Sequence, residues 1–218
     1  MHFSGNNDSI YFVFCFITVK AYRIAVSGSD AAGLDTGEKE WKLNMKKMED
    51  YVRSIPDFPE PGIIFRDVTS VLQDADGLHM AIDEMQKLIA DIDCDVIVGA
   101  ESRGFIFGMP IAYNLHKPFV LVRKKGKLPC ETIEREYDLE YGKATIEIHK
   151  DAIKPGQKVV LVDDLIATGG TMEAAAKLIE ELGGEVVRII FLMELAGLNG
   201  RERLKDYDVS SVICYDGK

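Results

Sequence analysis

The chain has 218 residues, of which 47% are hydrophobic and 28% charged, so it can bury one sizeable core. Its formal net charge of −10 gives a surface that repels phosphate backbones, which excludes general binding of nucleic acids and anionic membranes. The cysteines are too scattered for a disulfide framework or a zinc site, and no apolar run reaches the ~18–20 residues that span a bilayer, so we expect a protein of the reducing cytoplasm.

Residues 1–44 differ in composition from the rest of the chain. Residues 10–19 are almost wholly apolar and aromatic, and a Gly- and Asp-rich stretch without periodicity follows them. The apolar run lacks the positive charges that precede it in a signal peptide. We interpret residues 1–44 as an atypical extension, disordered or not native, and residues 45–218 as one domain. The alternatives are a targeting segment, or an ordered addition that recruits a partner or a membrane.

From residue 45 onward, apolar residues recur either at helical spacing or in the short runs typical of buried strands. In chain order, the predicted elements are helix 48–54, helix 77–92, strand 96–98, helix 104–115, strand 119–122, strand 144–149, strand 159–162, helix 171–182, strand 186–192 and strand 209–215. Two stretches are predicted to be irregular: the proline-rich residues 55–62, and a polar loop or hairpin at residues 124–143. Strands that alternate with helices predict an α/β fold with a doubly wound, mainly parallel sheet.

The motif at residues 159–171, VVLVDDLIATGGT, joins a buried strand, two carboxylates, a glycine-containing turn and a helix. Such a turn directs backbone N–H groups to one point, and the dipole of the following helix also favours a phosphate there. Gly169 and Gly170 are expected to allow close approach and a positive φ. Asp163 and Asp164 would repel a phosphate unless they face sugar hydroxyls or Mg²⁺. The motif therefore predicts a ribose 5-phosphate site, the alternative being a plain turn whose acids cap the helix.

Two further segments carry cations suited to a diphosphate. Residues 102–104 follow a predicted strand and open a helix, where the Arg103 guanidinium offers a bidentate fork. Arg123, Lys124 and Lys127 form a dense basic cluster in an acidic chain. The plainer interpretations are a surface arginine and a solvated loop.

Residues 159–171 match the signature by which type I phosphoribosyltransferases bind phosphoribosyl diphosphate (PRPP), and other segments resemble adenine phosphoribosyltransferases in that family's order. These segments are residues 56–67 (base binding), 101–105 (the loop after a strand), 123–129 (the basic loop) and 139–142 (loop closing). The resemblance covers about residues 48–215 and does not extend to residues 1–44. It departs from the family at Cys130, where a small residue is usual, and we assign Cys130 no role.

The resemblance implies the type I phosphoribosyltransferase fold, with a small hood formed by the N-terminal and C-terminal segments. It implies catalytic roles for Arg103 and Glu140, with Glu140 as general acid or base and Tyr141 as a loop-closing residue. For the ribose and the 5′-phosphate it implies Asp163, Asp164, Ala167, Thr168, Gly169, Gly170 and Thr171. For pyrophosphate it implies Arg103, Arg123, Lys124 and Lys127, and for adenine it implies Ile64, Phe65 and Arg66.

The reaction implied by the resemblance converts adenine and PRPP into AMP and pyrophosphate. Mg²⁺ would be carried by PRPP, near Asp163 and Asp164, without a protein site of its own. The family also implies a homodimer. The alternatives are a phosphoribosyltransferase for xanthine, hypoxanthine, guanine or orotate, and a non-catalytic PRPP-binding regulator. Such regulators usually carry a nucleic-acid-binding appendage with a basic face, and the sequence predicts neither.

Overall fold

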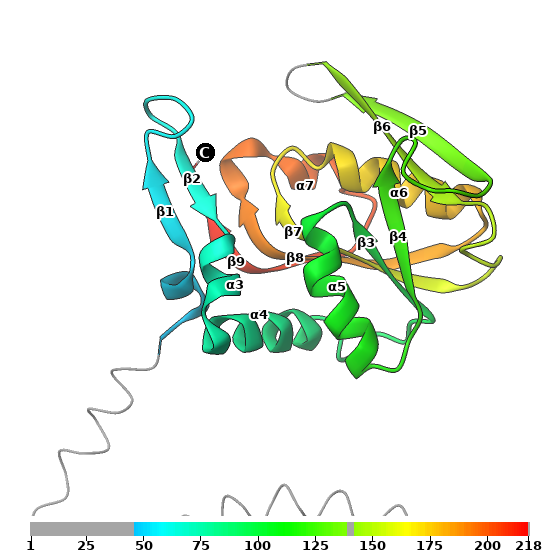
Figure 1. Cartoon of the computed structure of the whole chain (residues 1–218), viewed down its shortest axis with the longest axis horizontal. Coiled ribbons are helices and arrows are strands. Elements are labelled where there is room, and N and C mark those ends of the chain that lie inside the picture. Colours follow the sequence, from blue (N-terminus) through cyan, green and yellow to red (C-terminus); the bar gives the residue numbers. More distant parts are fainter. Residues whose placement is uncertain (1–45, 139–141, 218) are drawn as a thin grey trace, which may run out of the picture. The chain divides into compact units, whose positions relative to one another are not determined.

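The computed structural model describes residues 46–138 and 142–217 (Figure 1). Its main sheet has the strand order β5-β6-β4-β3-β7-β8-β9. In chain order these strands are β3 (Val96–Ala100), β4 (Phe119–Lys124), β5 (Thr132–Asp138), β6 (Lys143–His149), β7 (Lys158–Ile166), β8 (Glu185–Leu195) and β9 (Val209–Tyr215). The strands from β4 to β9 in this order are parallel, whereas β6 is antiparallel to both β4 and β5. The predicted α/β fold with a mainly parallel sheet is therefore confirmed.

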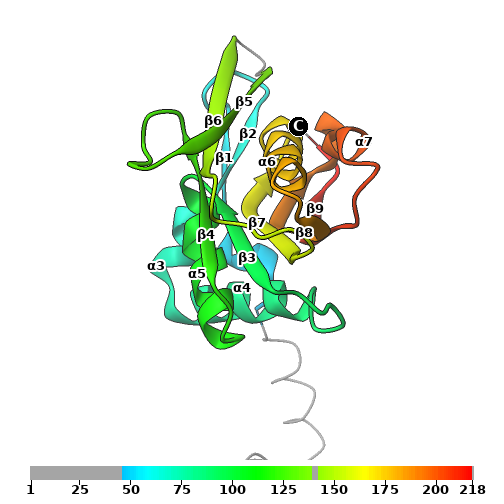
Figure 2. The same ribbon diagram turned by 90° about the vertical axis from the view of Figure 1, so that its right-hand side faces the viewer.

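Helices cover both faces of this sheet. They are η1 (Met48–Tyr51), α3 (Thr69–Gln73), α4 (Ala75–Lys87), α5 (Arg103–Asn114), α6 (Gly170–Glu181), η2 (Ala196–Leu198) and α7 (Gly200–Arg203). Figure 2 shows α6 on one side of the sheet, and α4 and α5 on the other. No helix among the described residues is long and apolar enough to cross a membrane.

The alternation of side chains along β7 explains why its apolar run is continuous. Val159 and Leu161 belong to the hydrophobic cluster that contains α6, whereas Val160 and Val162 belong to the cluster that contains α4 and α5. All four side chains are fully buried. Since burying one such side chain contributes about 1.5–3 kcal/mol, both clusters hold β7 in the centre of the sheet.

The N-terminal part of the domain differs from the prediction. The predicted helix 48–54 is only the short η1, because Arg53–Pro56 forms β1 and pairs antiparallel with β2 (Ile64–Asp67). The stretch 55–62 is therefore not wholly irregular, since Pro56 pairs with Ile64 at the end of this hairpin. The prediction also lacked α3, η2 and α7, which are too short to show a periodicity.

Other elements differ from the prediction in their bounds. The helix predicted at 77–92 begins earlier, because the Asp74 carboxylate accepts from the amides of Asp76 and Gly77, and it ends at Lys87. Tighter turns follow the helix, and Ile89 in these turns is still buried. The apolar residues therefore continue beyond the end of the helix, which is why the predicted helix is too long. Residues 124–143 contain β5, which pairs with β6, so the hairpin alternative is correct. The strand predicted at 159–162 extends through Ile166, which places Asp163 and Asp164 inside β7.

The β1–β2 hairpin meets the C-terminal strand through one stacked pair. The Arg66 guanidinium of β2 lies 3.9 Å from the centroid of the Tyr215 ring of β9, and Arg66 also donates to the Ser54 hydroxyl of β1. In Figure 1 the β1–β2 and β5–β6 hairpins project towards the same end of the sheet, on either side of the loop after β7. The N-terminal and C-terminal segments therefore come together as the expected hood requires.

Candidate active site

A cavity of about 400 Å³ lies at the carboxyl ends of β3 and β7. Six of the residues predicted for the site line it: Arg103, Lys124, Asp163, Asp164, Ala167 and Thr171. In open parallel sheets, the carboxyl ends of the strands are where ligands bind. The fold thus brings the two acids, two cations and part of the turn after β7 to one place.

Asp163 and Asp164 differ in their surroundings. Asp164 is buried, and its Oδ2 accepts from Nε of Arg103 at 2.5 Å. Asp163 is half-buried, and its Oδ1 accepts the amide of Asp164 at 2.9 Å. Burial, and after it the charge of Asp164, raise the pKa of the Asp163 carboxyl well above its usual range. Hydroxyl donors or a cation beside these carboxylates would relieve that repulsion.

The turn after β7 approaches another backbone segment closely. Gly169 has φ +78°, and a Cβ there would lie 2.7 Å from the carbonyl oxygen of Gly200. The predicted positive φ is thus confirmed for Gly169 and is wrong for Gly170, which is the first residue of α6. Thr168 and both glycines are not among the residues that line the cavity.

Thr171 makes a contact that the sequence did not reveal. Its Oγ1 lies 3.2 Å from the phenol oxygen of Tyr137, a residue of β5 that also lines the cavity. Tyr137 falls in the stretch 124–143 for which the sequence left loop and hairpin open. Ile133 and Tyr137 both pack on the hydrophobic cluster that contains α6, and their even spacing is a signal that could have identified the strand.

The basic cluster is divided by the structure. Lys124 lines the cavity, whereas Arg123 and Lys127 do not. The Arg123 guanidinium pairs with the Glu101 carboxylate at 3.2 Å and donates to the Lys127 carbonyl, also at 3.2 Å. Burial alone would raise the pKa of Glu101, but the Lys124 amide and Arg123 lower it overall. Arg123 is therefore engaged within the protein, and Glu101 is a site residue to which the sequence analysis gave no role.

The residues predicted for adenine lie in the β1–β2 hairpin. Ile64 and Phe65 are 41% and 39% exposed, and the Phe65 ring packs edge-on against Phe58 with centroids 5.3 Å apart. Neither they nor Arg66 lines the cavity at β3 and β7. Glu140 and Tyr141 lie outside the described residues.

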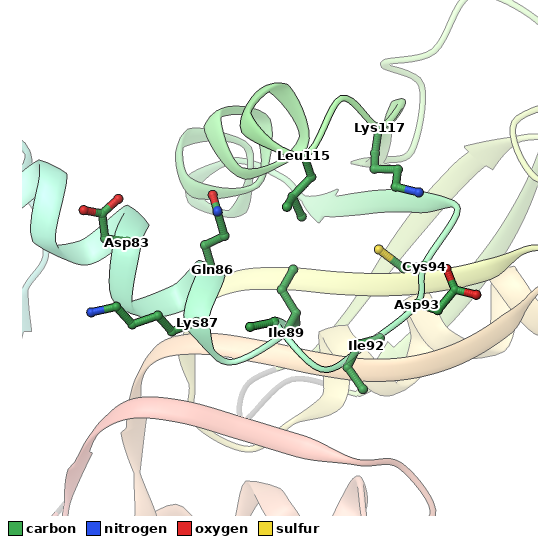
Figure 3. A pocket seen from close by; sticks show the side chains of 10 residues that line it. Asp83, Gln86, Lys87, Ile89, Ile92, Asp93, Cys94, Leu115 and Lys117 are labelled. Carbon is green, nitrogen blue, oxygen red and sulfur yellow. The ribbon is translucent and has the colours of Figure 1, made fainter. Parts of the chain in front are cut away.

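A second cavity, of about 490 Å³, lies near the amino end of β3 (Figure 3). Figure 3 shows Cys94, Leu115 and Lys117 around it, and burial raises the pKa of the Cys94 thiol. No residue predicted for the site lines this cavity. Its place at the opposite end of the parallel strands separates it from the carboxylates of β7.

Residues 46–138 and 142–217 contain no group of three or more His, Cys, Asp or Glu residues that could hold a metal ion. The paired carboxylates of Asp163 and Asp164 line the cavity, as does Glu101, whose carboxylate already accepts from Arg123 and the Lys124 amide. Such hard donors suit Mg²⁺ when substrate phosphates and water complete its coordination.

Comparison with known proteins gives a consistent result. The model of the phosphoribosyl transferase domain matches residues 69–216. An adenine phosphoribosyltransferase of Butyrivibrio fibrisolvens is 78% identical over 174 residues, which are 80% of this chain and 96% of that protein. One from Agathobacter rectalis is 74% identical, over 80% of this chain and all of that protein.

Solved structures agree with these relatives. The adenine phosphoribosyltransferase of Thermoanaerobacter pseudethanolicus has a TM-score of 0.74 and 52% identity, covering 77% of this chain and 98% of that chain. The enzyme of Giardia lamblia in complex with 9-deazaadenine has a TM-score of 0.72 and 36% identity, covering 78% of this chain and 99% of that chain.

Proposed function

Because the chain belongs to the adenine phosphoribosyltransferase family, we propose that the cavity at the carboxyl ends of β3 and β7 is its active site. The chain transfers the phosphoribosyl group of PRPP to adenine, giving AMP and pyrophosphate. The observation that supports the location is the convergence of Arg103, Asp163 and Asp164 on one cavity.

Each part of PRPP has a matching part of this cavity. The carboxylates of Asp163 and Asp164 accept from the ribose hydroxyls, and the turn from Ala167 to Thr171 holds the 5′-phosphate at the start of α6. Arg103 and Lys124 neutralise the diphosphate as it leaves. Arg123 and Lys127 support this group from the neighbouring loop.

The chemistry exchanges one bond at the anomeric carbon of the ribose for another. The bond from that carbon to the diphosphate oxygen breaks while a bond to N9 of adenine forms, and the transition state resembles a ribosyl cation. The carboxylates of Asp163 and Asp164 hold the sugar in place as positive charge develops on it. Glu140 exchanges the proton of the purine as general acid or base, and Tyr141 closes the loop over the site.

The residues present fit Mg²⁺ that arrives with PRPP. The pKa of Asp163 is raised by desolvation at its half-buried position and then by the charge of Asp164, so a nearby cation stabilises its ionised form. When bound, Mg²⁺ neutralises charge on the leaving diphosphate.

The β1–β2 hairpin binds adenine. Phe65 stacks on the base, beside Ile64 and Arg66.

We propose that the protein works as a homodimer in the cytoplasm. Helix α5 carries Ile106, Met109 and Tyr113 on one face, and these side chains are 40%, 53% and 82% exposed. Exposed apolar patches of this kind mark protein interfaces, and α5 begins at Arg103 in the proposed site. A Met109→Glu variant should sediment as a monomer, whereas an unchanged dimer would place the interface elsewhere.

We also propose that residues 45–218 form the phosphoribosyltransferase domain and that residues 1–44 are an extension dispensable for catalysis. The family model begins at residue 69, and the Butyrivibrio fibrisolvens relative matches 174 of the 218 residues.

An assay of nucleotide formation from PRPP, with adenine, hypoxanthine, guanine and xanthine in parallel, tests the proposed function. We expect turnover with adenine that exceeds turnover with each other base, and an Asp163→Asn, Asp164→Asn double variant that stays folded and inactive. Rates in the double variant close to those of the natural chain would contradict the location of the site.

A further inference from the structure

Glu147 of β6 is a buried carboxylate, only 4% exposed, beside the basic loop. This loop, residues 123–129, begins at the end of β4 and contains Lys124 and Lys127. Oε1 of Glu147 accepts from the amides of Lys127 and Leu128, each at 2.8 Å. A carboxylate buried in a β-strand is costly unless it is hydrogen-bonded, so these contacts account for its presence.

The backbone N–H groups that bind Glu147 keep its carboxylate ionised. Burial would raise the pKa of its carboxyl, but backbone N–H groups of Leu128, Gly126 and Lys127 lower it overall. Consecutive amides that converge on an anion form a nest, and here the anion is a side chain of the protein itself. Hydrogen bonds to an ionised acceptor are about twice as strong as neutral ones.

The other end of the loop is held by a second carboxylate. Glu101, which follows β3, accepts the Lys124 amide at 2.9 Å and the Arg123 guanidinium at 3.2 Å. Arg123 in turn donates to the Lys127 carbonyl at 3.2 Å, so it braces the loop from inside. The backbone of the loop is therefore fixed at Lys124 by Glu101 and at Lys127 by Glu147.

We propose that Glu147 is a positioning residue of the pyrophosphate site, which fixes the basic loop so that Lys124 meets the diphosphate of PRPP and Lys127 supports it from the loop. The inference rests on the proposed role of this loop in holding pyrophosphate. Glu147 does not touch the substrate, because its carboxylate is buried against the loop backbone. A free loop would lose conformational entropy when its lysines bind the diphosphate. Because Glu147 already holds the loop in place, this loss is smaller.

Steady-state kinetics in both directions separates positioning from general stability. We expect Glu147→Ala to raise the KM for pyrophosphate and for PRPP about tenfold, since it removes two hydrogen bonds to a charged acceptor. Glu147→Gln keeps an acceptor oxygen and should raise them only about threefold. The KM values for AMP and adenine should not change, because neither ligand reaches the loop.

Glu134→Gln is the matched control. Glu134 stands opposite Glu147 in the β5–β6 pairing, but its carboxylate binds the exposed Lys125 side chain and no backbone amide of the loop. It should leave all four KM values unchanged. Equal rises in the KM for AMP and for pyrophosphate in Glu147→Gln, or no rise in either, would overturn the inference.

Lys124→Ala distinguishes this inference from the function on which it rests. If Lys124→Ala raises the KM for pyrophosphate and Glu147→Gln does not, the loop binds pyrophosphate without help from Glu147 and only the inference is wrong. If Lys124→Ala also has no effect, the proposed role of the basic loop is wrong, and the inference falls with it.

Discussion

Nε of Arg103 donates to Oδ2 of Asp164 at 2.5 Å, and this ion pair joins the start of α5 to β7. It links the cation proposed for pyrophosphate to an acid proposed for ribose. The Asp164 side chain is 5% exposed and needs a partner for its charge, whereas Arg103 is half exposed. Because a guanidinium has five N–H donors, the bond from Nε orients Arg103 and leaves other donors for the diphosphate.

Replacing Asp164 with Asn removes the charge that orients Arg103 and leaves one acceptor oxygen in place of two. We expect kcat/KM for PRPP to fall about a hundredfold or more, as when a charged group is lost from a preorganised site. Asp208→Asn serves as control, because it breaks the ion pair with Arg188 at 2.7 Å, near the start of β8 and away from the cavity. A variant Asp164→Asn as active as Asp208→Asn would contradict the role of Asp164.

The raised pKa of Asp163 predicts how stability depends on pH. A carboxyl with a higher pKa in the folded chain binds its proton more tightly there, so its contribution is present below the unfolded pKa and is lost as pH rises through the folded pKa. Asp163→Asn cannot ionise, so without ligand it should have a higher Tm than the natural chain at about pH 8, and a smaller advantage at about pH 5.

Thermal unfolding at the two pH values, without PRPP or Mg²⁺, tests this dependence. AMP formation by the same variant should fall about a hundredfold. A Tm below that of the natural chain at both pH values would show that Asp163 is not strained by burial and repulsion.

The regular elements could be predicted from the sequence because each has a strong local pattern. The apolar run of β7 and the spacing of α6 depend on residues adjacent in the chain, and both elements are present at the predicted places, although β7 extends beyond the predicted strand to Ile166. The β1–β2 hairpin could not be predicted in this way, because it depends on pairing between Pro56 and Ile64 across a proline-rich turn. There, tertiary pairing overrides local preference.

The candidate site likewise contains residues that local sequence predicts and residues that only tertiary structure brings in. Asp163, Asp164 and Arg103 were predicted because they follow recognisable strands. Tyr137 and Glu147 were not, since β5 and β6 reach the site from elsewhere in the chain, and only the folded structure brings them to Thr171 and to the basic loop.

Gly104 is required where α5 meets β7. A Cβ at this position would lie 2.6 Å from the Val162 carbonyl oxygen and 3.0 Å from Oδ1 of Asp163. Gly104→Ala should therefore lower the free energy of unfolding by about 1–3 kcal/mol and raise the KM for PRPP, because α5 and Asp163 must move apart. Urea denaturation and initial rates measure both effects. Gly217→Ala, which meets no atom within 4 Å, is the control, and equal behaviour of the two variants would contradict the packing argument.

A chain that begins at Met45 should retain the activity of the full chain. The proposed catalytic residues all follow residue 45, and a match of 174 residues covers 96% and 100% of two relatives. We expect kcat and KM values for adenine and PRPP within about twofold, because no group of the site is removed. A large loss of activity in the shorter chain would assign residues 1–44 a part in the enzyme.

The contact between Tyr137 and Thr171 predicts energetic coupling at the phosphate site. In the structure the Thr171 hydroxyl donates to the phenol oxygen of Tyr137 at 3.2 Å. When Thr171 instead donates to the 5′-phosphate, both hydroxyls rotate and Tyr137 donates to Thr171. Tyr137→Phe removes only the phenol hydroxyl and should weaken binding of AMP about three- to tenfold, without a change for pyrophosphate.

A double-mutant cycle with Thr171→Val isolates this coupling. If Tyr137 acts through Thr171, the change Tyr137→Phe should have no further effect on AMP binding once the Thr171 hydroxyl is absent. Tyr207→Phe is the control, because the Tyr207 hydroxyl donates to Glu180, elsewhere on α6. Calorimetric titration with AMP measures all the variants. Additive losses would mean that Tyr137 and Thr171 act independently, and that the contact between them carries no part of phosphate binding.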